Sequence, residues 1–221
     1  MLRMSKSSLL LITFVLVLVF QAKADPVFVV GGRIAKSDGM PLVNAKVQIK
    51  NITNLSLAVK EIVTDAGGIY KILFIDLFDD EGANNEFVSL GDVLQLQVSD
   101  ASNNIVAVHT QTVTAVGIAN KFIETNMQLF ATAEDTGKTI NLAPVDMAKQ
   151  VTSYSIVSPP ASGAVSILDP ASGEALYSPE SDVNGSDSFV FAIVYADGSS
   201  ERVIAKIAIS SVDDPPVVDK C

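Results

Sequence analysis

The sequence predicts an all-β protein made of two consecutive β-sandwich domains that follow a signal peptide. Three observations carry this prediction: apolar and polar residues alternate with a period of two, turn dipeptides separate the alternating runs, and no long helical period appears. The alternation is clearest in residues 45–50, 93–98, 188–191 and 203–209. The turn signals are Asp38-Gly39, Gly67-Gly68, Asn184-Gly185 and Asp197-Gly198. Only residues 145–150 have a helical tendency, and that segment is too short to form a helix alone.

Residues 1–24 predict a secretory signal peptide. Arg3 and Lys6 form a basic start, and an apolar run extends over residues 9–20. Ala22-Lys23-Ala24 then offers small residues at the positions that a signal peptidase reads. An uncleaved membrane anchor is the alternative, but the apolar run is shorter than the ~20 residues that a spanning helix needs. We therefore expect cleavage after Ala24, a secreted or cell-surface protein, and no membrane insertion after cleavage.

The mature chain is strongly acidic. The full sequence has a net charge of −10, and loss of the leader's three basic residues leaves 12 basic against 25 acidic residues, a net charge of −13. Such a surface repels the phosphates of nucleic acids, so we expect no nucleic-acid partner. It also suits a protein that meets divalent cations outside the cell, although the acids can equally serve only to keep the protein soluble.

Cys221 is the only cysteine, so no internal disulfide is expected and each domain must be stabilised by a full core. The strand pattern places one domain at residues 25–130 and the other at 131–214, and both lengths suit a single sandwich. Residues 215–221 begin with two prolines and are expected to be a linker or a truncated tail, which implies further modules in a longer chain. An intermolecular disulfide through Cys221 is the alternative for this end.

The first domain carries a spaced series of turn and strand motifs. They are Val30-Gly31-Gly32-Arg33-Ile34, Asp38-Gly39-Met40-Pro41-Leu42, Asn44-Ala45-Lys46-Val47, Thr64-Asp65-Ala66-Gly67-Gly68-Ile69-Tyr70 and Gly91-Asp92-Val93-Leu94. This series resembles the carboxypeptidase regulatory-like domain, a transthyretin-like β-sandwich, and the resemblance implies a domain without chemistry of its own. Ala45 is small enough to enter a core, and Tyr70 is expected to pack inward. The insertion at 78–86 is longer than a turn needs, and a carbohydrate-binding loop is one hypothesis for it.

The second domain has a different series. It runs through Glu134-Asp135-Thr136, Pro160-Ala161-Ser162-Gly163, Tyr177-Ser178-Pro179, Asn184-Gly185-Ser186-Asp187-Ser188-Phe189 and Val212-Asp213-Asp214-Pro215-Pro216. This series resembles the cadherin-like, immunoglobulin-like tandem repeat of bacterial surface proteins. Asp213 stands where that family usually has asparagine. The resemblance implies a repeat that normally occurs in strings.

Groups for catalysis are scarce in this sequence. His109 is the only histidine and lies in an alternating strand, where a half-exposed structural role is expected. No serine sits in a nucleophile-elbow motif, and Gly31-Gly32 precedes a strand instead of a helix that could cradle a phosphate. We therefore expect a protein that is not an enzyme.

Calcium is the one ligand that the residue pattern favours. Ca²⁺ takes oxygen ligands from flexible acidic loops, and the second domain places acids at its start, at its end and in one turn. The predicted ligands are Glu134, Asp135, Asp187 and Asp213. Two alternatives need no ion: Asp187 can brace its turn through backbone hydrogen bonds, and Glu134-Asp135 can solvate a linker.

Two binding-type domains behind a signal peptide favour a secreted or cell-surface adhesion protein or structural spacer. Its expected partner is an extracellular protein or a glycan. An accessory, non-catalytic region of a secreted hydrolase is the alternative, and a carbohydrate-binding module is another. The reading frame downstream of Cys221 distinguishes these, because more repeats favour adhesion and a catalytic domain favours the hydrolase.

Overall fold

The structure is a computed structural model that describes residues 27–55, 58–75 and 88–213. Its regular elements are strands with one exception, which confirms the predicted all-β class. The predicted signal peptide, the loop at 78–86 and Cys221 lie outside the described residues. Among the residues described, no helix has the length and apolar character to cross a membrane.

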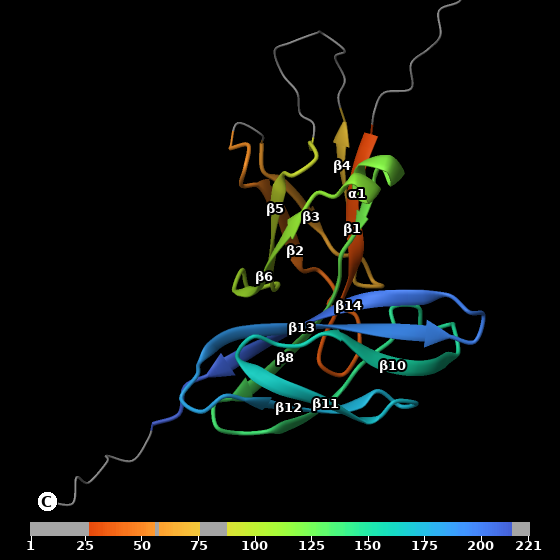
Figure 1. Ribbon diagram of the computed structural model, residues 1–221. Helices are drawn as coiled ribbons and strands as arrows, with labels where there is room; N and C mark the ends of the chain where they lie inside the picture. Colours follow the sequence, from red (N-terminus) through yellow and green to blue (C-terminus); the bar gives the residue numbers. More distant parts are fainter. Residues whose placement is uncertain (1–26, 56–57, 76–87, 214–221) are drawn as a thin grey trace, which may run out of the picture.

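The first sandwich packs two sheet layers around one core (Figure 1). One layer consists of β1 (Val27–Ala35), β4 (Ile69–Ile75) and β7 (Phe122–Glu124). The other has the strand order β3 (Lys60–Val63), β2 (Lys46–Asn51), β5 (Val93–Ser99) and β6 (Ile105–Thr112). Tyr70 and Ala45 are both buried in this core, as predicted. The Tyr70 hydroxyl donates to the Thr125 carbonyl oxygen at 2.9 Å, and burial raises the pKa of this tyrosine.

The second sandwich has the same two-layer construction. Its larger layer has the order β10 (Val151–Ser158), β13 (Gly185–Tyr195), β14 (Ser200–Ser210) and β8 (Asn126–Ala133). The facing layer has the order β11 (Gly163–Asp169), β12 (Glu174–Pro179) and β9 (Lys138–Asn141). Inward-facing aromatic residues fill the space between them, among them Tyr154 and Phe191, whose ring centroids lie 6.3 Å apart.

One continuous sheet joins the two sandwiches. Its order is β10-β13-β14-β8-β1-β4, with β7 also on β1, so β8 lies between the first strand of one sandwich and the last strand of the other. β8 serves both cores, because Met127 packs into the first and Phe130 into the second. The predicted boundary at residues 130 and 131 falls inside β8 and stays a prediction.

The described helix is α1 (Ala115–Asn120), which connects β6 to β7. The Thr114 hydroxyl accepts a hydrogen bond from the Gly117 amide at 3.2 Å, and Lys121 ends the helix in the left-handed conformation at φ 52°. Residues 145–150 form no helix. That segment instead lies in an irregular connection between β9 and β10.

Three of the four predicted turns are present, with Gly39, Gly68 and Gly198 at positive φ, whereas Gly185 also has a positive φ but is the first residue of β13. Gly68 is the most constrained of them. A Cβ atom there would lie 2.4 Å from the Ile34 carbonyl oxygen, so the β3–β4 turn can approach β1 only because this residue lacks a side chain.

Candidate functional site

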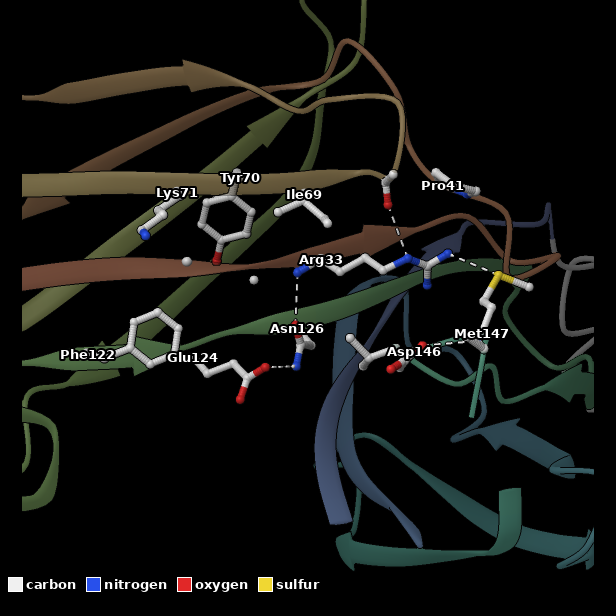
Figure 2. A pocket seen from close by; sticks show the side chains of 15 residues that line it. Arg33, Pro41, Ile69, Tyr70, Lys71, Phe122, Glu124, Asn126, Asp146 and Met147 are labelled. Atoms are coloured by element: carbon white, nitrogen blue, oxygen red, sulfur yellow. Dashed lines mark hydrogen bonds between the residues drawn. The ribbon is translucent and has the colours of Figure 1, made fainter. Parts of the chain in front are cut away.

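A cleft of about 680 Å³ lies where the two sandwiches meet. β1, β4 and β7 form one side, and the segment 145–148 of the second sandwich forms the other (Figure 2). Its lining residues are Gly31, Gly32, Arg33, Pro41, Gly67, Ile69, Tyr70, Lys71, Phe122, Glu124, Asn126, Val145, Asp146, Met147 and Ala148. This volume is in the range of small-ligand sites, so the cleft is the candidate site of this chain.

Arg33 lies at the buried end of the cleft and makes hydrogen bonds to both sandwiches. Its side chain is 8% exposed, and its guanidinium donates to the carbonyl oxygens of Gly39 at 2.9 Å and Gly67 at 3.2 Å. Both carbonyls belong to turns of the first sandwich. The same guanidinium donates to the Pro144 carbonyl oxygen at 3.3 Å, in the second sandwich, and lies 3.7 Å from the Met147 sulfur. Burial lowers the pKa of this guanidinium, and its five N–H groups spread the charge over carbonyl oxygens.

Gln128, a buried residue of β8, makes a second polar connection. Its side-chain amide donates to the Asn141 carbonyl oxygen at 2.9 Å and to the Lys36 carbonyl oxygen at 3.4 Å. Its side-chain oxygen accepts a hydrogen bond from the Ala143 amide at 3.0 Å. Gln128 therefore links a turn of the first sandwich to the start of the second, and these contacts fix the relative orientation of the two.

The outer part of the cleft is apolar. Ile69 and Met147 are 52% and 60% exposed on opposite walls, and Phe122 is also exposed. Gly31 leaves the floor open, because a Cβ atom there would already touch the Tyr70 carbonyl oxygen at 3.0 Å. Such a surface can hold an apolar group of a ligand. The charged side chains that line the cleft are Arg33, Lys71, Glu124 and Asp146, and no described hydrogen bond joins one of them to a nucleophilic side chain.

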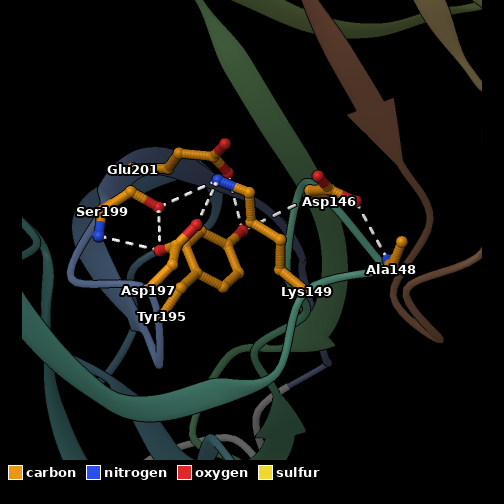
Figure 3. Close-up of polar contacts among 7 residues, drawn as sticks. All are labelled: Asp146, Ala148, Lys149, Tyr195, Asp197, Ser199 and Glu201. Carbon is orange, nitrogen blue, oxygen red and sulfur yellow. Dashed lines mark hydrogen bonds and ion pairs between the residues drawn. The ribbon is translucent and has the colours of Figure 1, made fainter.

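A polar cluster on the second sandwich fixes the cleft wall (Figure 3). The Lys149 ammonium lies 3.1 Å from the Asp197 carboxylate, donates to the Ser199 hydroxyl at 2.9 Å and sits 5.1 Å from the centre of the Tyr195 ring. The Tyr195 hydroxyl donates to Glu201 at 2.7 Å and accepts from the Asp146 amide at 3.3 Å. These contacts attach the segment that carries Met147 to the β13–β14 hairpin.

The charges of this cluster suit an ion pair and not a nucleophile. A hydrogen bond with Asp197 raises the pKa of Lys149, so its amine stays protonated. Hydrogen bonds from Ser199 and Lys149 lower the pKa of Asp197 to about 2. The ion pair and the hydrogen bonds hold residues 146–149 against the β13–β14 hairpin.

The structure places Asp187, one of the predicted calcium ligands, inside the second sandwich. Its carboxylate is 6% exposed and accepts hydrogen bonds from the amides of Ala161 at 3.0 Å and Ser162 at 3.1 Å. It also accepts from the Ser188 amide at 2.7 Å and the Tyr177 hydroxyl at 2.9 Å. Four donors surround this carboxylate, and they tie the residues before β11 to β12 and β13.

Glu134 and Asp135 follow β8 and contact the segment that leads into β13, where the Asn184 side-chain amide donates to the Glu134 carboxylate at 3.4 Å. No described hydrogen bond joins either residue to Asp187. Glu134 is 4% exposed and accepts from the Val212 amide at 2.6 Å, whereas Asp135 accepts from the Asp182 amide at 3.1 Å. Asp213 is exposed. Within the described ranges, no three His, Cys, Asp or Glu side chains form a group that could hold a metal ion.

Calcium binding therefore stays a prediction. Thermal melting at millimolar Ca²⁺ tests it, because an ion bound only by the folded chain raises the melting temperature. A melting temperature that does not change with Ca²⁺ would contradict calcium binding. An equal increase in wild type and in Glu134→Gln would show that Glu134 is not a ligand.

His109 lies in β6 of the first sandwich. It stands opposite Leu96 in the ladder, is half-buried, and makes no hydrogen bond to a serine or an acid in the part of the chain that the structure describes. Burial and the nearby Lys206 ammonium lower the pKa of His109 to about 4. This position fits the predicted structural role.

Stability is expected to fall between pH 6.5 and pH 4 because of His109. The fold favours the neutral imidazole, so its contribution is complete above the unfolded pKa of about 6.5 and is lost as the pH falls through the folded value of about 4. Allowing for solvent screening at a half-buried site, we expect a loss of about 1–2 kcal/mol. Urea unfolding of wild type and His109→Gln at pH 7 and pH 4.5 measures this loss as a difference, which cancels other titrations. Equal pH dependence in the two proteins would contradict it.

Comparison with known families gives one match, in the second sandwich and the strand before it. Residues 121–210 match the family model described as a bacterial Ig domain, and Ser210 is the last residue of β14. The match supports an Ig-like fold for this part of the chain. The finer resemblance to cadherin-like repeats, and the resemblance of the first sandwich to the carboxypeptidase regulatory-like domain, stay predictions. No curated protein matches the sequence.

Solved structures show only distant likeness. An endo-fucoidan hydrolase of glycoside hydrolase family 107 is 12% identical, with a TM-score of 0.32 over 55% of this chain and 19% of that chain. The ectodomain of human desmocollin-1 is 9% identical, with a TM-score of 0.29 over 75% of this chain and 33% of that one. The major pilin subunit of Bacillus cereus is 8% identical, with a TM-score of 0.28 over 83% and 69%. The chain thus spans about a fifth of the hydrolase, and no functional conclusion follows from likeness at this level.

The residues that join the two sandwiches carry little signal in the sequence. Arg33 is a lone charge in the otherwise apolar strand Val27–Ala35, which marks it as a buried cation in need of acceptors. Gln128 has no such mark, because a glutamine in an alternating strand normally faces solvent. Its partners, Lys36 and Asn141, lie in connections that the sequence alone does not bring together.

Proposed function

We propose that this chain is an exported, non-catalytic spacer or adhesion protein whose two sandwiches behave as one rigid body. The observation that carries the proposal is the continuous sheet in which β8 pairs with both β1 and β14. Arg33 and Gln128 add side-chain hydrogen bonds across the same junction. A chain built as two linked but independent domains would lack such contacts, since interfaces between mobile domains are crossed by few of them.

A non-catalytic role is supported by the state of the candidate groups. Asp187 is surrounded by hydrogen-bond donors, Lys149 is protonated, and His109 is isolated from serines and acids within the described residues. The bacterial Ig match over residues 121–210 supports a domain of the binding or structural type. The signal peptide predicted at 1–24 supports export, and its cleavage would leave Asp25 as the first residue of the mature protein.

Rigid behaviour is expected in solution. Backbone ¹⁵N relaxation of residues 25–221 should give the same rotational correlation time for strand amides of both sandwiches, because the shared sheet prevents independent tumbling. Two distinct and shorter correlation times would overturn the rigid-spacer proposal. Sequencing of the protein recovered from the medium or the cell surface tests export separately, and a first residue other than Asp25 would contradict the predicted cleavage.

A further inference from the structure

Four strands of the shared sheet, β1, β7, β8 and β14, run in the same direction. β1 is parallel to β7 from Val29↔Phe122 to Gly31↔Glu124, and to β8 at Ile34↔Met127 and Ala35↔Gln128. β8 is parallel to β14 over its full length, from Asn126↔Val203 to Ala133↔Ser210. The other strand pairs in the described residues are antiparallel. Parallel neighbours are therefore confined to the first and last strands of each sandwich.

This arrangement decides how the fold responds to tension. In a parallel pair, the start of one strand and the end of the other lie at opposite ends of the ladder. Tension on those two points loads all the hydrogen bonds of the pair together. Tension on two points at the same end would instead peel the bonds one after another. The described chain enters at the start of β1 and leaves at the end of β14 (Figure 1). Tension between these two points therefore loads the pair of β1 with β7 and the pair of β8 with β14 in shear.

The first sandwich transmits the load across hydrogen bonds at both ends of its parallel pair. The Val29 amide donates to the Lys121 carbonyl oxygen at 2.9 Å, and the Thr125 amide donates to the Gly31 carbonyl oxygen at 2.8 Å. The Arg33 amide donates to the Asn126 side-chain oxygen at 2.9 Å. Because β7 leads directly into β8, the load then passes along one segment, residues 122–133, into the second sandwich.

Glu134 extends the second pair beyond its ladder. Its amide donates to the Ser210 carbonyl oxygen at 2.9 Å, and its buried carboxylate accepts from the Val212 amide at 2.6 Å. A hydrogen bond to a charged acceptor is stronger than a neutral one. Glu134 therefore holds the departing chain at the point where tension on the C-terminal side first acts.

We propose that the chain bears tension along its length, through two shear-loaded strand pairs in series that share residues 122–133, with Glu134 as the lock at the exit. This function deepens the spacer function proposed above, and it identifies what the spacer is built to withstand. Resistance to force depends on the unfolding rate under load and not on the equilibrium stability alone.

Single-molecule pulling in two geometries tests the proposal on the mature chain. The first geometry pulls between the N-terminus and Cys221, which is the only cysteine. The second pulls between the N-terminus and a cysteine at exposed Ser200, in Ser200→Cys with Cys221→Ser, so that β8 and β14 are loaded at the same end. We expect the second sandwich to unfold at a several-fold higher force in the first geometry. The first sandwich, loaded identically in both, is the internal reference, and the two are told apart by their gain in contour length.

Glu134→Ala gives the second arm, with Glu174→Ala, an exposed acid on β12, as its matched control. The Glu134 variant should lower the end-to-end unfolding force and leave the Ser200 geometry unchanged, because peeling begins at the opposite end of β8. Equal forces in the two geometries for wild type would overturn the proposal. A Glu134 variant that lowers the unfolding force equally in both geometries would contradict the role proposed for Glu134. Both outcomes are independent of the relaxation experiment, which applies no load and tests only the rigid junction.

Discussion

Arg33→Met is expected to lower the free energy of unfolding by about 3 kcal/mol, since hydrogen bonds to a charged group contribute about 1.5–3 kcal/mol each. The substitution removes the donor of three carbonyl oxygens, those of Gly39, Gly67 and Pro144. Two effects offset the loss: a buried cation no longer has to be desolvated, and water can reach the exposed side of the cleft. Urea unfolding at pH 7 measures the change.

Two further variants separate the geometry of Arg33 from its charge. Arg33→Lys keeps the charge but offers one ammonium in place of a planar fork, so it should recover only part of the loss. Arg202→Met removes an exposed arginine of β14 and should change stability by no more than about 0.5 kcal/mol. An Arg33→Met protein as stable as the Arg202→Met protein would mean that the three carbonyls do not depend on the guanidinium.

The sequence predicted the strands well because their pattern is local. The alternating runs at 93–98 and 203–209 lie within β5 and β14, and the run at 188–191 lies within β13. Alternation of apolar and polar residues reflects a pleated strand with one buried face, so it can be read without knowing the partner strand. The turn glycines are equally local, since positive φ is a property of the single residue.

The junction between the sandwiches could not be predicted in the same way. Ile34 and Met127 become neighbours in the sheet although 93 residues separate them, and no local pattern specifies a parallel pairing. Residues 145–150 form no helix, as their shortness predicted, and the contacts of Lys149 and the Asp146 amide that hold this segment as a cleft wall have no local signal in the sequence. The helix that does form, at 115–120, depends on the cap at Thr114 more than on periodicity.

For the predicted calcium ligands too, the sequence identified residues but not their contacts. Asp187 was identified as a residue that matters, but whether its carboxylate binds an ion or backbone amides depends on three separate segments meeting at one point. Glu134 was identified for the same reason, and the structure gives it two roles on the departing chain. The sequence thus indicates which acidic residues make stabilising contacts in turns. Which groups donate hydrogen bonds to their carboxylates depends on the tertiary structure.

Asp187→Ala is expected to destabilise the protein more than Arg33→Met does. We expect a loss of about 3–5 kcal/mol in the free energy of unfolding, because the substitution leaves buried donors without an acceptor. The Ala161 and Ser162 amides and the Tyr177 hydroxyl lose their partner, and Tyr177 is only 1% exposed. The connection before β11 would then no longer be tied to β13. Thermal and urea unfolding of the mature chain measure the loss.

Asp187→Asn and Asp197→Ala make the interpretation of that loss specific. The asparagine keeps the shape and one acceptor oxygen but directs an amide group at neighbouring donors, so it should retain most of the destabilisation. Asp197→Ala removes an acid whose ion pair with Lys149 lies at the surface, where solvent screens the charges, so it should cost much less stability than Asp187→Ala. If instead Asp187→Asn were nearly as stable as wild type, the second carboxylate oxygen would be dispensable, and shape alone would hold this corner of the second sandwich together.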